Sequence, residues 1–366
     1  MTTHWDIHPQ TGFLLAPQPL RHLGDVDSPL ATDAITTLEA LANHLPQAPR
    51  TDLADVPLYD FSTVGNADPR LAERLFLLYG YFANKYVHQA PAVTTLPRVL
   101  ALPLVQLAAH LGRPPILAYA GMVLGNWWRR DPTAAFTAQN VDVLQRFTTL
   151  IDEAWFFRVH IAIEAQAGTM LATLLALRDA IAAGDDGRVQ DGLRHVRAGL
   201  VHITQTFHEM PKLCDPDVYY QQVRPYLFGF TDVDYEGVPD APRNLRGGSG
   251  AQSSLVPFLL GALGIEHAQT DLTRHLHTMR AYMPRPHQRA IDQMSTLGLR
   301  AYCQHRPPLR DAYNHVLRQL MTFRRAHLYY ARAYIFAKTT NPVGTGGTDF
   351  MHFLNRLIAE TDAQQL

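Results

Sequence analysis

The sequence predicts an all-α protein, and three observations support this fold class. Several long stretches repeat apolar residues at the period of a helix that packs one face, or all of its faces, into a core. No run of alternating apolar and polar residues is long enough to indicate a β-strand. No internal repeat is visible, which argues against a solenoid. With 366 residues, of which 47% are hydrophobic and 18% charged, the chain can form one large core or two domains.

The N-terminal part is expected to be irregular at first and helical later. Residues 1–70 are rich in proline and aspartate, so most of this segment should wrap around a helical body. Pro114 and Pro115 are tolerated in a first helical turn and are expected to start a helix over ILAYAGMVLGNWW. Asp131 and Pro132 then interrupt the pattern. The other helices predicted in this part cover residues 31–45, 71–87, 99–111 and 140–150.

The C-terminal part is predicted to hold the longest helices. One runs over residues 152–183 and ends before Gly184, as a glycine C-cap would end it. A second follows over residues 189–209. Residues 228–252 are too rich in turn-forming residues to be helical. Glycine-rich segments precede the helices predicted over residues 252–263 and 350–360, and such segments present free backbone N–H groups.

Residues 309–338 are predicted to form an amphipathic helix, and His327 lies within its apolar stripe. We expect the packing that buries the stripe to bury the imidazole as well, which costs free energy unless its nitrogens find partners. A core histidine bonded to a carbonyl and a metal ligand both meet that need, and this helix alone favours the first. The other members of the stripe are Tyr313, Val316, Leu317, Leu320, Phe323, Tyr330, Tyr334 and Ile335.

Composition excludes several classes of protein. A formal net charge of −1 argues against sequence-independent binding to nucleic acid or to anionic lipid. The two cysteines, Cys214 and Cys303, are far apart, which argues against a disulfide framework, a zinc knuckle and covalent haem attachment. No signal peptide and no long uninterrupted apolar span is visible. We therefore expect a cytoplasmic protein.

Three groups of residues carry possible chemistry, and each also has a plain structural interpretation. The glycine-rich segments lack the lysine and the spacing of a phosphate-binding loop, so they are more often mobile surface connections. Tyr220 and Arg224 would share a helix face, which suits either a carboxylate clamp or a surface stacking pair. Phe156 and His160 point the same way on their helix, although core packing explains such a stripe equally well. His275 and His277 belong to none of these groups and are interpreted as surface residues.

Taken together, several segments resemble the indoleamine 2,3-dioxygenase family of haem enzymes. The resemblance covers roughly residues 71–366. The order of GGSGAQSS and GTGGTD, with an Arg-x-x-His helix between them, makes the set highly specific. In chain order the segments read RPPILAYAGMVLGNW, WFF, DPDVYYQQVRPYL, RGGSGAQSSLVPFLLGALGI, MRAYMPRPHQ, RRAHL and GTGGTDFMHFL.

The resemblance implies where a haem would bind. The family's fold is a large all-α domain that holds haem b, capped by a smaller, mostly helical N-terminal domain; we assign these to residues 148–366 and 1–147. His327 corresponds to the proximal iron ligand, with ferrous iron in the active state. Arg324 would lie near a haem propionate. The residues implied at the haem edge and the oxygen site are Gly248, Ser249 and Gly250.

The resemblance also implies a substrate pocket. Arg224 would hold the carboxylate of the substrate, and Thr345, on a loop that closes over it, would contact the ammonium and carboxylate end. The catalytic residues expected are His160, Ser249 and Thr345. The remaining members line the pocket: Phe156 and Phe157 as walls, Tyr119, Met122 and Val123 as the floor, and Tyr219 and Tyr220 beside the arginine.

Two residues depart from the family's mammalian pattern. Those members carry serine where His160 stands, whereas in the related tryptophan 2,3-dioxygenases a distal histidine faces the indole N–H. We expect His160 to make that hydrogen bond. The aspartate that links the propionate-side arginine to the haem is Leu260 here, so Arg324 must find another partner.

The activity that the resemblance implies is opening of the indole 2,3 bond of L-tryptophan, or of a close derivative, by O2 to give N-formylkynurenine. One alternative is rearrangement or mono-oxygenation of a modified tryptophan in secondary metabolism, which a product assay would distinguish. A second is a non-catalytic haem or indole binder, which would show a spectral shift with the indole but no turnover of O2. No partner beyond the indole substrate is expected, neither nucleic acid nor membrane, and we expect a monomer.

Overall fold

The computed structural model describes residues 7–15, 18–338 and 350–366. Within these residues, helices joined by irregular segments form the molecule, and strands are confined to two short pairs. The parallel pair joins β1 (Thr95–Leu96) to β4 (Asp234–Tyr235), and the antiparallel pair joins β2 (Trp128–Arg129) to β3 (Val141–Asp142). The prediction of an all-α fold is confirmed.

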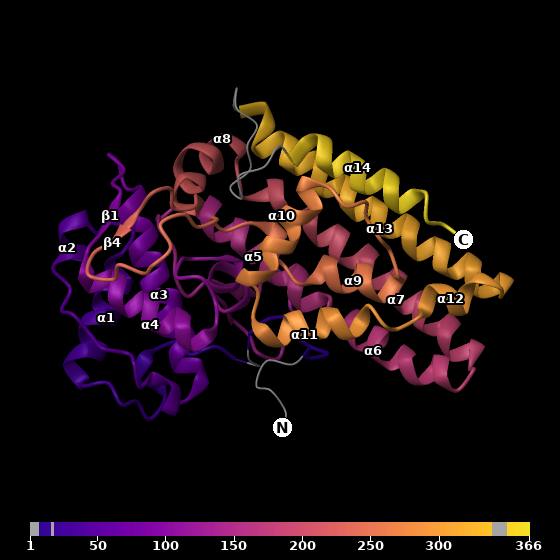
Figure 1. The fold of residues 1–366 in the computed structure, drawn as a ribbon, viewed down its shortest axis with the longest axis horizontal. Coiled ribbons are helices and arrows are strands. Elements are labelled where there is room, and N and C mark those ends of the chain that lie inside the picture. Colours follow the sequence, from indigo (N-terminus) through magenta and orange to yellow (C-terminus); the bar gives the residue numbers. More distant parts are fainter. Residues whose placement is uncertain (1–6, 16–17, 339–349) are drawn as a thin grey trace.

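The first helices form the lobe at the left of Figure 1. Asp68 begins the long central helix of this lobe by accepting a hydrogen bond from the backbone N–H of Arg70. Nearly all side chains of that helix are buried, as its apolar composition on every face predicts. The helices of this lobe are α1 (Thr32–His44), α2 (Arg50–Ala54), α3 (Pro69–His88) and α4 (Arg98–Leu111).

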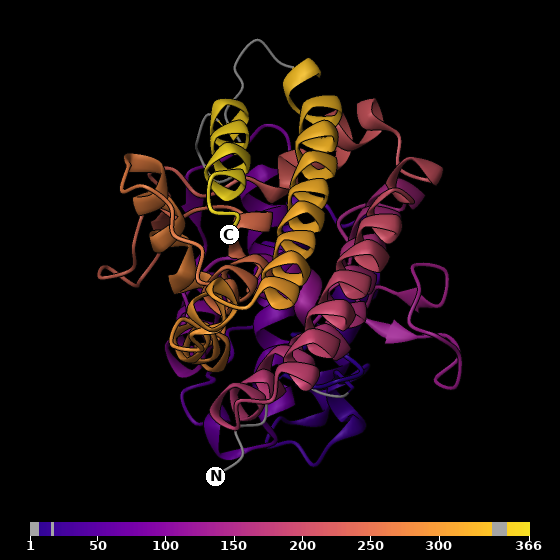
Figure 2. The ribbon, with the colours of Figure 1, turned by 90° about the vertical axis from the view of Figure 1, so that its right-hand side faces the viewer.

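The chain after residue 150 contributes the helices at the centre and right of Figure 1. Figure 2 shows α13 running between α7 and α14. The predicted apolar stripe of α13 is buried, apart from Ile335, which is half-buried. These helices are α5 (Ile151–Gln166), α6 (Gly168–Ala182), α7 (Asp186–Phe207), α9 (Leu255–Leu263), α13 (Pro307–Tyr334) and α14 (Phe350–Asp362).

Shorter helices connect these elements, and the sequence analysis did not anticipate most of them. Two are single π-helical turns, η3 (Ala120–Leu124) and η5 (Tyr219–Val223), and both carry predicted site residues. The other α-helices are α8 (Pro216–Val218), α10 (Asp271–Met279), α11 (Arg285–Met294) and α12 (Leu299–Gln304). The 3-10 turns are η1 (Leu23–Asp25), η2 (Val64–Asn66), η4 (Met210–Lys212), η6 (Arg224–Leu227), η7 (Gly250–Gln252), η8 (Arg280–Tyr282) and η9 (Phe336–Lys338).

The helix predicted after Pro115 is wrong except for the single turn η3. Its apolar residues are buried, apart from the half-buried Trp128, but other groups replace the helical hydrogen bonds of its backbone. The backbone N–H of Tyr119 donates to Oε1 of Gln252 at 3.0 Å, and the carbonyl of Pro115 accepts from the Tyr235 hydroxyl at 2.7 Å. Buried side chains from distant elements thus satisfy this segment and outweigh its local helical preference.

The helix predicted over residues 140–150 is also wrong. After β3 the chain is irregular, and side chains again take over its backbone N–H groups. Oδ1 of Asn126 accepts from Leu144 and from Gln145, at 3.0 and 2.7 Å. The Glu153 carboxylate accepts from Phe147 and Thr148, both at 2.7 Å. A compact irregular turn therefore leads into α5.

The long helix predicted over residues 152–183 exists, but it is interrupted at Ala167 between α5 and α6. The N-terminal segment crosses it there at close range. A Cβ atom on Gly168 would lie 2.5 Å from the carbonyl oxygen of Pro9, and one on Gly12 would lie 2.1 Å from the carbonyl oxygen of Glu164. Among the described residues this helix pair is long and apolar enough to cross a membrane, yet 61% of its most apolar window is buried in the fold.

Candidate active site

His327 lies on α13 where the stripe predicts, but it does not pack into the core. Phe323 and Tyr330 on either side are buried, whereas the His327 side chain is exposed. The surrounding protein nevertheless lowers the pKa of His327 to about 4, first by removing water and then through the charges of His160 and Arg324. Because the His327 ring is accessible and yet strongly desolvated, we infer a hollow in front of it. This corrects the expectation that packing alone buries it.

Among residues 7–15, 18–338 and 350–366, the nitrogens of His327 find none of the partners that a core histidine needs. In the part of the chain that the structure describes, neither ring nitrogen makes a hydrogen bond. The same residues contain no group of three or more His, Cys, Asp or Glu side chains that could hold a metal ion. The ring can therefore serve as a single ligand to a metal whose other ligands do not come from the protein.

His160 faces the same hollow from α5. Its Nδ1 lies 2.8 Å from the carbonyl oxygen of Phe156, one turn earlier. Since a carbonyl only accepts, Nδ1 carries the proton and Nε2 keeps its lone pair. Burial lowers the pKa of His160, which keeps the ring neutral. The Phe207 ring contacts both histidines, with its centroid 6.0 Å from that of the His160 ring and 6.2 Å from that of the His327 ring.

Aromatic rings join the two histidines around one side of the site. From His160 the contacts pass to Phe156 at 4.5 Å and then to Tyr219, which stacks on Phe156 at 4.4 Å. They continue through Tyr334 and Tyr330 on α13 and return to Phe207. This ring of aromatic side chains includes Phe156 and Tyr219, which the sequence predicted. Phe207, Tyr330 and Tyr334 were not predicted as site residues.

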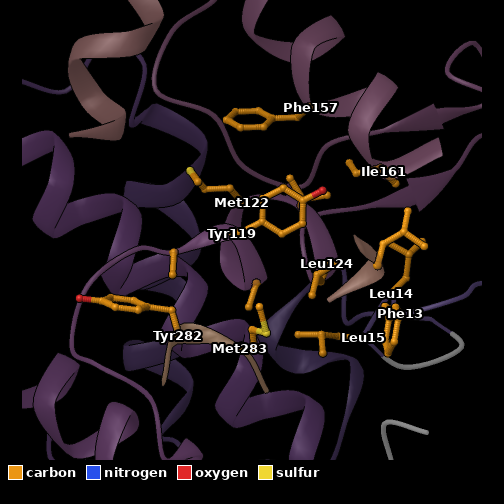
Figure 3. Packing of buried hydrophobic residues seen from close by; sticks show 14 of the residues in the cluster. Phe13, Leu14, Leu15, Tyr119, Met122, Leu124, Phe157, Ile161, Tyr282 and Met283 are labelled. Atoms are coloured by element: carbon orange, nitrogen blue, oxygen red, sulfur yellow. The ribbon is translucent and has the colours of Figure 1, made fainter. Parts of the chain in front are cut away.

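The predicted floor residues are buried on and just before η3. Figure 3 shows the Phe157 ring of α5 next to Met122, with the ring of Tyr119 beside them. The Tyr119 ring meets the His160 ring edge to face at 6.5 Å, and its hydroxyl donates to Oε1 of Glu164 at 2.9 Å. Val123 is buried in the same turn. The structure therefore brings Tyr119, Met122 and Phe157 together.

The glycine-rich segment before η7 packs directly against this floor. A Cβ atom on Gly248 would lie 1.7 Å from Cε of Met122, so no larger residue fits without a shift. Around Gly250, in contrast, an added Cβ would meet no atom within 4 Å. Ser249 caps η7 by accepting a hydrogen bond from the backbone N–H of Ala251. Gln252, which the sequence analysis did not single out, joins this segment to Tyr119.

Arg224 begins η6 directly after the π-turn η5 and is buried, with 4% of its surface exposed. Its guanidinium lies over the rings of Tyr220 and Phe228, at 5.2 and 4.7 Å. Burial lowers its pKa, but an arginine stays charged at neutral pH. The structure thus favours a held, desolvated cation over a surface stacking pair. Phe228 was not predicted.

Arg324 on α13 finds its partners in α14 and in the link before α10. Its Nη1 donates to the carbonyl oxygen of Leu357 at 2.7 Å and to the Thr361 hydroxyl. Its Nη2 donates to Nε2 of His267 at 3.2 Å. Arg324 needed another partner because Leu260 stands where the mammalian proteins have an aspartate, and His267 is that partner.

One predicted residue cannot be placed, because Thr345 lies outside the described residues. A shallow hollow elsewhere, between α1 and α2, contains none of the predicted site residues. The assignments of individual roles therefore rest on the geometry around the two histidines.

Comparison with known proteins agrees with this geometry. The sequence profile of the indoleamine 2,3-dioxygenase family matches residues 1–343. The chain belongs to the indoleamine 2,3-dioxygenase family. Rat indoleamine 2,3-dioxygenase 1 is 31% identical over 327 residues, which cover 81% of this chain and 80% of the rat protein. The yeast indoleamine 2,3-dioxygenase (Saccharomyces cerevisiae) is 27% identical over 98% of this chain and 92% of its own length. A 6-hydroxytryptophan 2,3-dioxygenase of Fusarium equiseti is 28% identical, with coverages of 91% and 84%.

As a member of the indoleamine 2,3-dioxygenase family, the chain is a haem-dependent dioxygenase, and the residues present fit a haem. His327 offers an imidazole that no described residue binds. Arg324 uses three of the five N–H groups of a guanidinium in the hydrogen bonds above, which leaves two for an anionic propionate. Gly250 is exposed and an added Cβ there would meet no atom within 4 Å, so this segment leaves room for a group beside it.

Proposed function

We propose that this chain uses O2 to open the 2,3 bond of the indole ring of L-tryptophan, and that N-formylkynurenine is the product. Both oxygen atoms of O2 enter the product, one at each carbon of the broken bond, so the overall reaction needs no external reductant. A ferrous haem b on His327 would supply the iron at which O2 reacts. The observation that carries the proposal is a pair of histidines with lowered pKa values that contact the same aromatic ring, that of Phe207.

His160 would orient the indole ring through its N–H group. Because Nδ1 donates to the Phe156 carbonyl, Nε2 can accept but cannot donate. An indole N–H is a donor only, so the two groups are complementary. A neutral His160 thus holds the ring without taking up a full charge in a desolvated pocket.

Arg224 would bind the carboxylate of the amino acid. A guanidinium forms two parallel hydrogen bonds to a carboxylate, which fixes direction as well as position. Its place in η6, at the end of the segment that carries Tyr219, sets the amino-acid end of the substrate near the aromatic wall formed with Phe156. Two fixed points, at His160 and at Arg224, align the reacting carbons.

The aromatic side chains would exclude water from the bound indole. Phe157 and Met122 are buried at its expected position, and Phe156 stacks on Tyr219 at the side. We retain Ser249 and Thr345 as proposed contacts to the haem edge and to the amino-acid end of the substrate. Exclusion of water strengthens each polar contact inside the pocket and protects the reactive oxygen from side reactions.

A substituted tryptophan is the second candidate substrate. The Fusarium relative is named for 6-hydroxytryptophan, so a family member of comparable similarity is named for a modified indole. The same pocket residues would orient the ring, and only the benzo-ring side of the indole would need different contacts.

An aerobic product assay tests the proposal. Purified, haem-loaded protein with a reductant to keep the iron ferrous is mixed with L-tryptophan or with 6-hydroxytryptophan, and the absorbance of the formylkynurenine product is followed. Turnover of L-tryptophan at a higher kcat/KM supports the main proposal, and turnover of the hydroxylated substrate alone supports the second. Binding of either without consumption of O2 would contradict both.

A further inference from the structure

A chain of three polar side chains, buried at Arg324 and His267 and partly exposed at Glu360, connects α13, α14 and the link between α9 and α10. Arg324 on α13 is buried, with 5% of its surface exposed. It donates through Nη2 to Nε2 of His267 at 3.2 Å, and Nδ1 of His267 lies 2.7 Å from Oε2 of Glu360 on α14. Arg324 also reaches α14 directly, at Leu357 and Thr361.

The order of these bonds fixes the proton on His267. A carboxylate only accepts, so Nδ1 of His267 must donate to Glu360. Nε2 then holds a lone pair and can accept from Arg324, which has no accepting atom of its own. Glu360 thereby polarises His267 toward Arg324, in the way that a carboxylate orients a histidine toward a metal.

The alternatives nearby do not replace His267. Leu260, on α9, has an aliphatic side chain and offers Arg324 no acceptor. The carbonyl of Leu357 and the Thr361 hydroxyl bind Nη1 and carry no charge. Within the described residues, His267 with Glu360 is therefore the route by which a negative charge acts on the buried guanidinium.

We propose that His267, backed by Glu360, is a positioning residue that holds Arg324 beside the haem and fastens α14 to the helix of the iron ligand. Arg324 precedes His327 by about one helical turn, so a displacement of its side chain acts close to the haem. Without Nε2 of His267 as acceptor, the buried guanidinium of Arg324 is partly unpaired. Its contacts with α14 and its hydrogen bonds to a haem propionate should then be weaker. The inference rests on the proposed binding of haem at His327.

Two variants with matched controls test the proposal. His267→Leu removes both bonds, whereas His267→Gln keeps an acceptor for Arg324 and a donor for Glu360. His275→Leu changes a half-buried histidine on α10 that contacts neither residue. Glu360→Gln removes only the charge, and its control Arg356→Ala removes the other partner of Glu360, 2.7 Å away.

Two measurements report on the two consequences. Haem loss from the ferric protein is followed by transfer to excess apomyoglobin, and the docking of α14 is followed by hydrogen exchange of its backbone amides. We expect His267→Leu to raise the rate of haem loss about tenfold or more and to speed exchange in α14, because a buried charged bond is lost. His267→Gln should stay within about threefold of the wild type, Glu360→Gln should be intermediate, and both controls should match the wild type.

The results separate this inference from the proposed function. If His267→Leu, or Glu360→Gln should the first variant not fold, keeps wild-type haem loss and wild-type exchange in α14, the positioning role is wrong. If the wild type takes up no haem at all, the proposed function fails. The exchange of α14 then still decides whether His267 fastens that helix.

Discussion

His160 is the residue whose chemistry is set most closely by its local backbone. The carbonyl one turn earlier selects its tautomer, and burial keeps it neutral. The ring therefore presents an acceptor to the hollow, whatever substrate enters. Its contacts with Phe156 and Tyr119 hold it against rotation.

Replacing His160 should weaken binding of tryptophan and remove its preference over the 1-methyl analogue. With His160→Leu we expect KM for L-tryptophan to rise about tenfold, since one buried hydrogen bond of about 1.4 kcal/mol is lost. The 1-methyl analogue, which has no indole N–H, should bind as well as before. Steady-state kinetics and spectral titrations with both compounds measure this. Equal changes for both compounds would disprove the proposed bond, and His160→Asn, which keeps an acceptor, is the control.

Replacing Arg224 should act on the carboxylate alone. Arg224→Met should raise the dissociation constant of L-tryptophan about 100-fold, because a desolvated charge pair contributes about 3 kcal/mol. Tryptamine, which has no carboxylate, should bind the variant and the wild type within about threefold. Spectral titration of the ferric protein gives both constants. A comparable loss for tryptamine would mean that the variant damages the pocket in general.

Individual residues were predicted unevenly from the sequence. The apolar stripe located His327, but only the structure shows that its side chain stays accessible instead of packing into the core. Arg224 and His160 were found through motifs. Phe207 and Gln252 carried no such signal, because Phe207 lies in an ordinary amphipathic helix and Gln252 acts through contacts with residues far away in the chain.

At the scale of elements, the π-turn η3 and the glycine-rich segment before η7 depend on each other. Gly248→Ala would force a Cβ against the flexible end of the buried Met122 side chain, which must move aside, so we expect a loss of about 1 kcal/mol in the free energy of unfolding. Gly250→Ala, where the space is open, should change it by less than about 0.5 kcal/mol. Urea unfolding measures both variants.

A double-mutant cycle with Met122→Ala separates the clash from other effects of the alanine. The double variant should be more stable than the two single changes predict by about 1 kcal/mol, since removing the thioether relieves the clash. Additive losses would show that Met122 is not the side chain that excludes a Cβ at position 248.

Glu164 couples three elements through hydroxyl groups. Its Oε1 accepts from Tyr119 before η3 and from Ser253 after η7, at 2.9 and 2.6 Å. Burial raises its pKa from 4.5 to about 7 in the folded protein. A carboxyl group with a raised pKa contributes stability fully below pH 4.5, and this contribution is lost as the pH rises through 7.

Glu164→Gln should remove this pH dependence and keep an oxygen acceptor for both hydroxyls. We expect the unfolding free energy of the wild type, relative to the variant, to fall by on the order of 3 kcal/mol from about pH 4.5 to about pH 8. Urea unfolding of both proteins across this range measures it. Parallel pH profiles would mean that Glu164 has an ordinary pKa in the folded state.

Elements with strong amphipathic periodicity were predicted well, and those fixed by distant side chains were not. The helices α1, α3, α4, α7, α9, α13 and α14 agree with their predicted ranges. The helices predicted around Tyr119 and Phe147 are wrong, because the side chains of Gln252 and Glu153 accept hydrogen bonds from the backbone N–H groups of these two residues. No local pattern records such bonds.

At the scale of the whole molecule, the pocket lies where the two halves of the chain meet. Residues 226–236 return to the N-terminal lobe: the side-chain amide of Asn84 on α3 donates to the carbonyl of Tyr226 at 2.9 Å, and β4 pairs with β1. Arg224 directly precedes this return. The division at residue 147, a monomeric state and a cytoplasmic location stay predictions.

The ferrous spectrum of His327→Ala tests most directly whether the hollow between α13 and α5 is a haem pocket with His327 as the iron ligand. The wild type should take up haem and give the spectrum of five-coordinate ferrous haem with an imidazole ligand, whereas the variant should not retain haem. Added imidazole should restore binding, because the free ligand can occupy the space that the side chain leaves. A variant that keeps the wild-type five-coordinate spectrum without imidazole would contradict the assignment of His327.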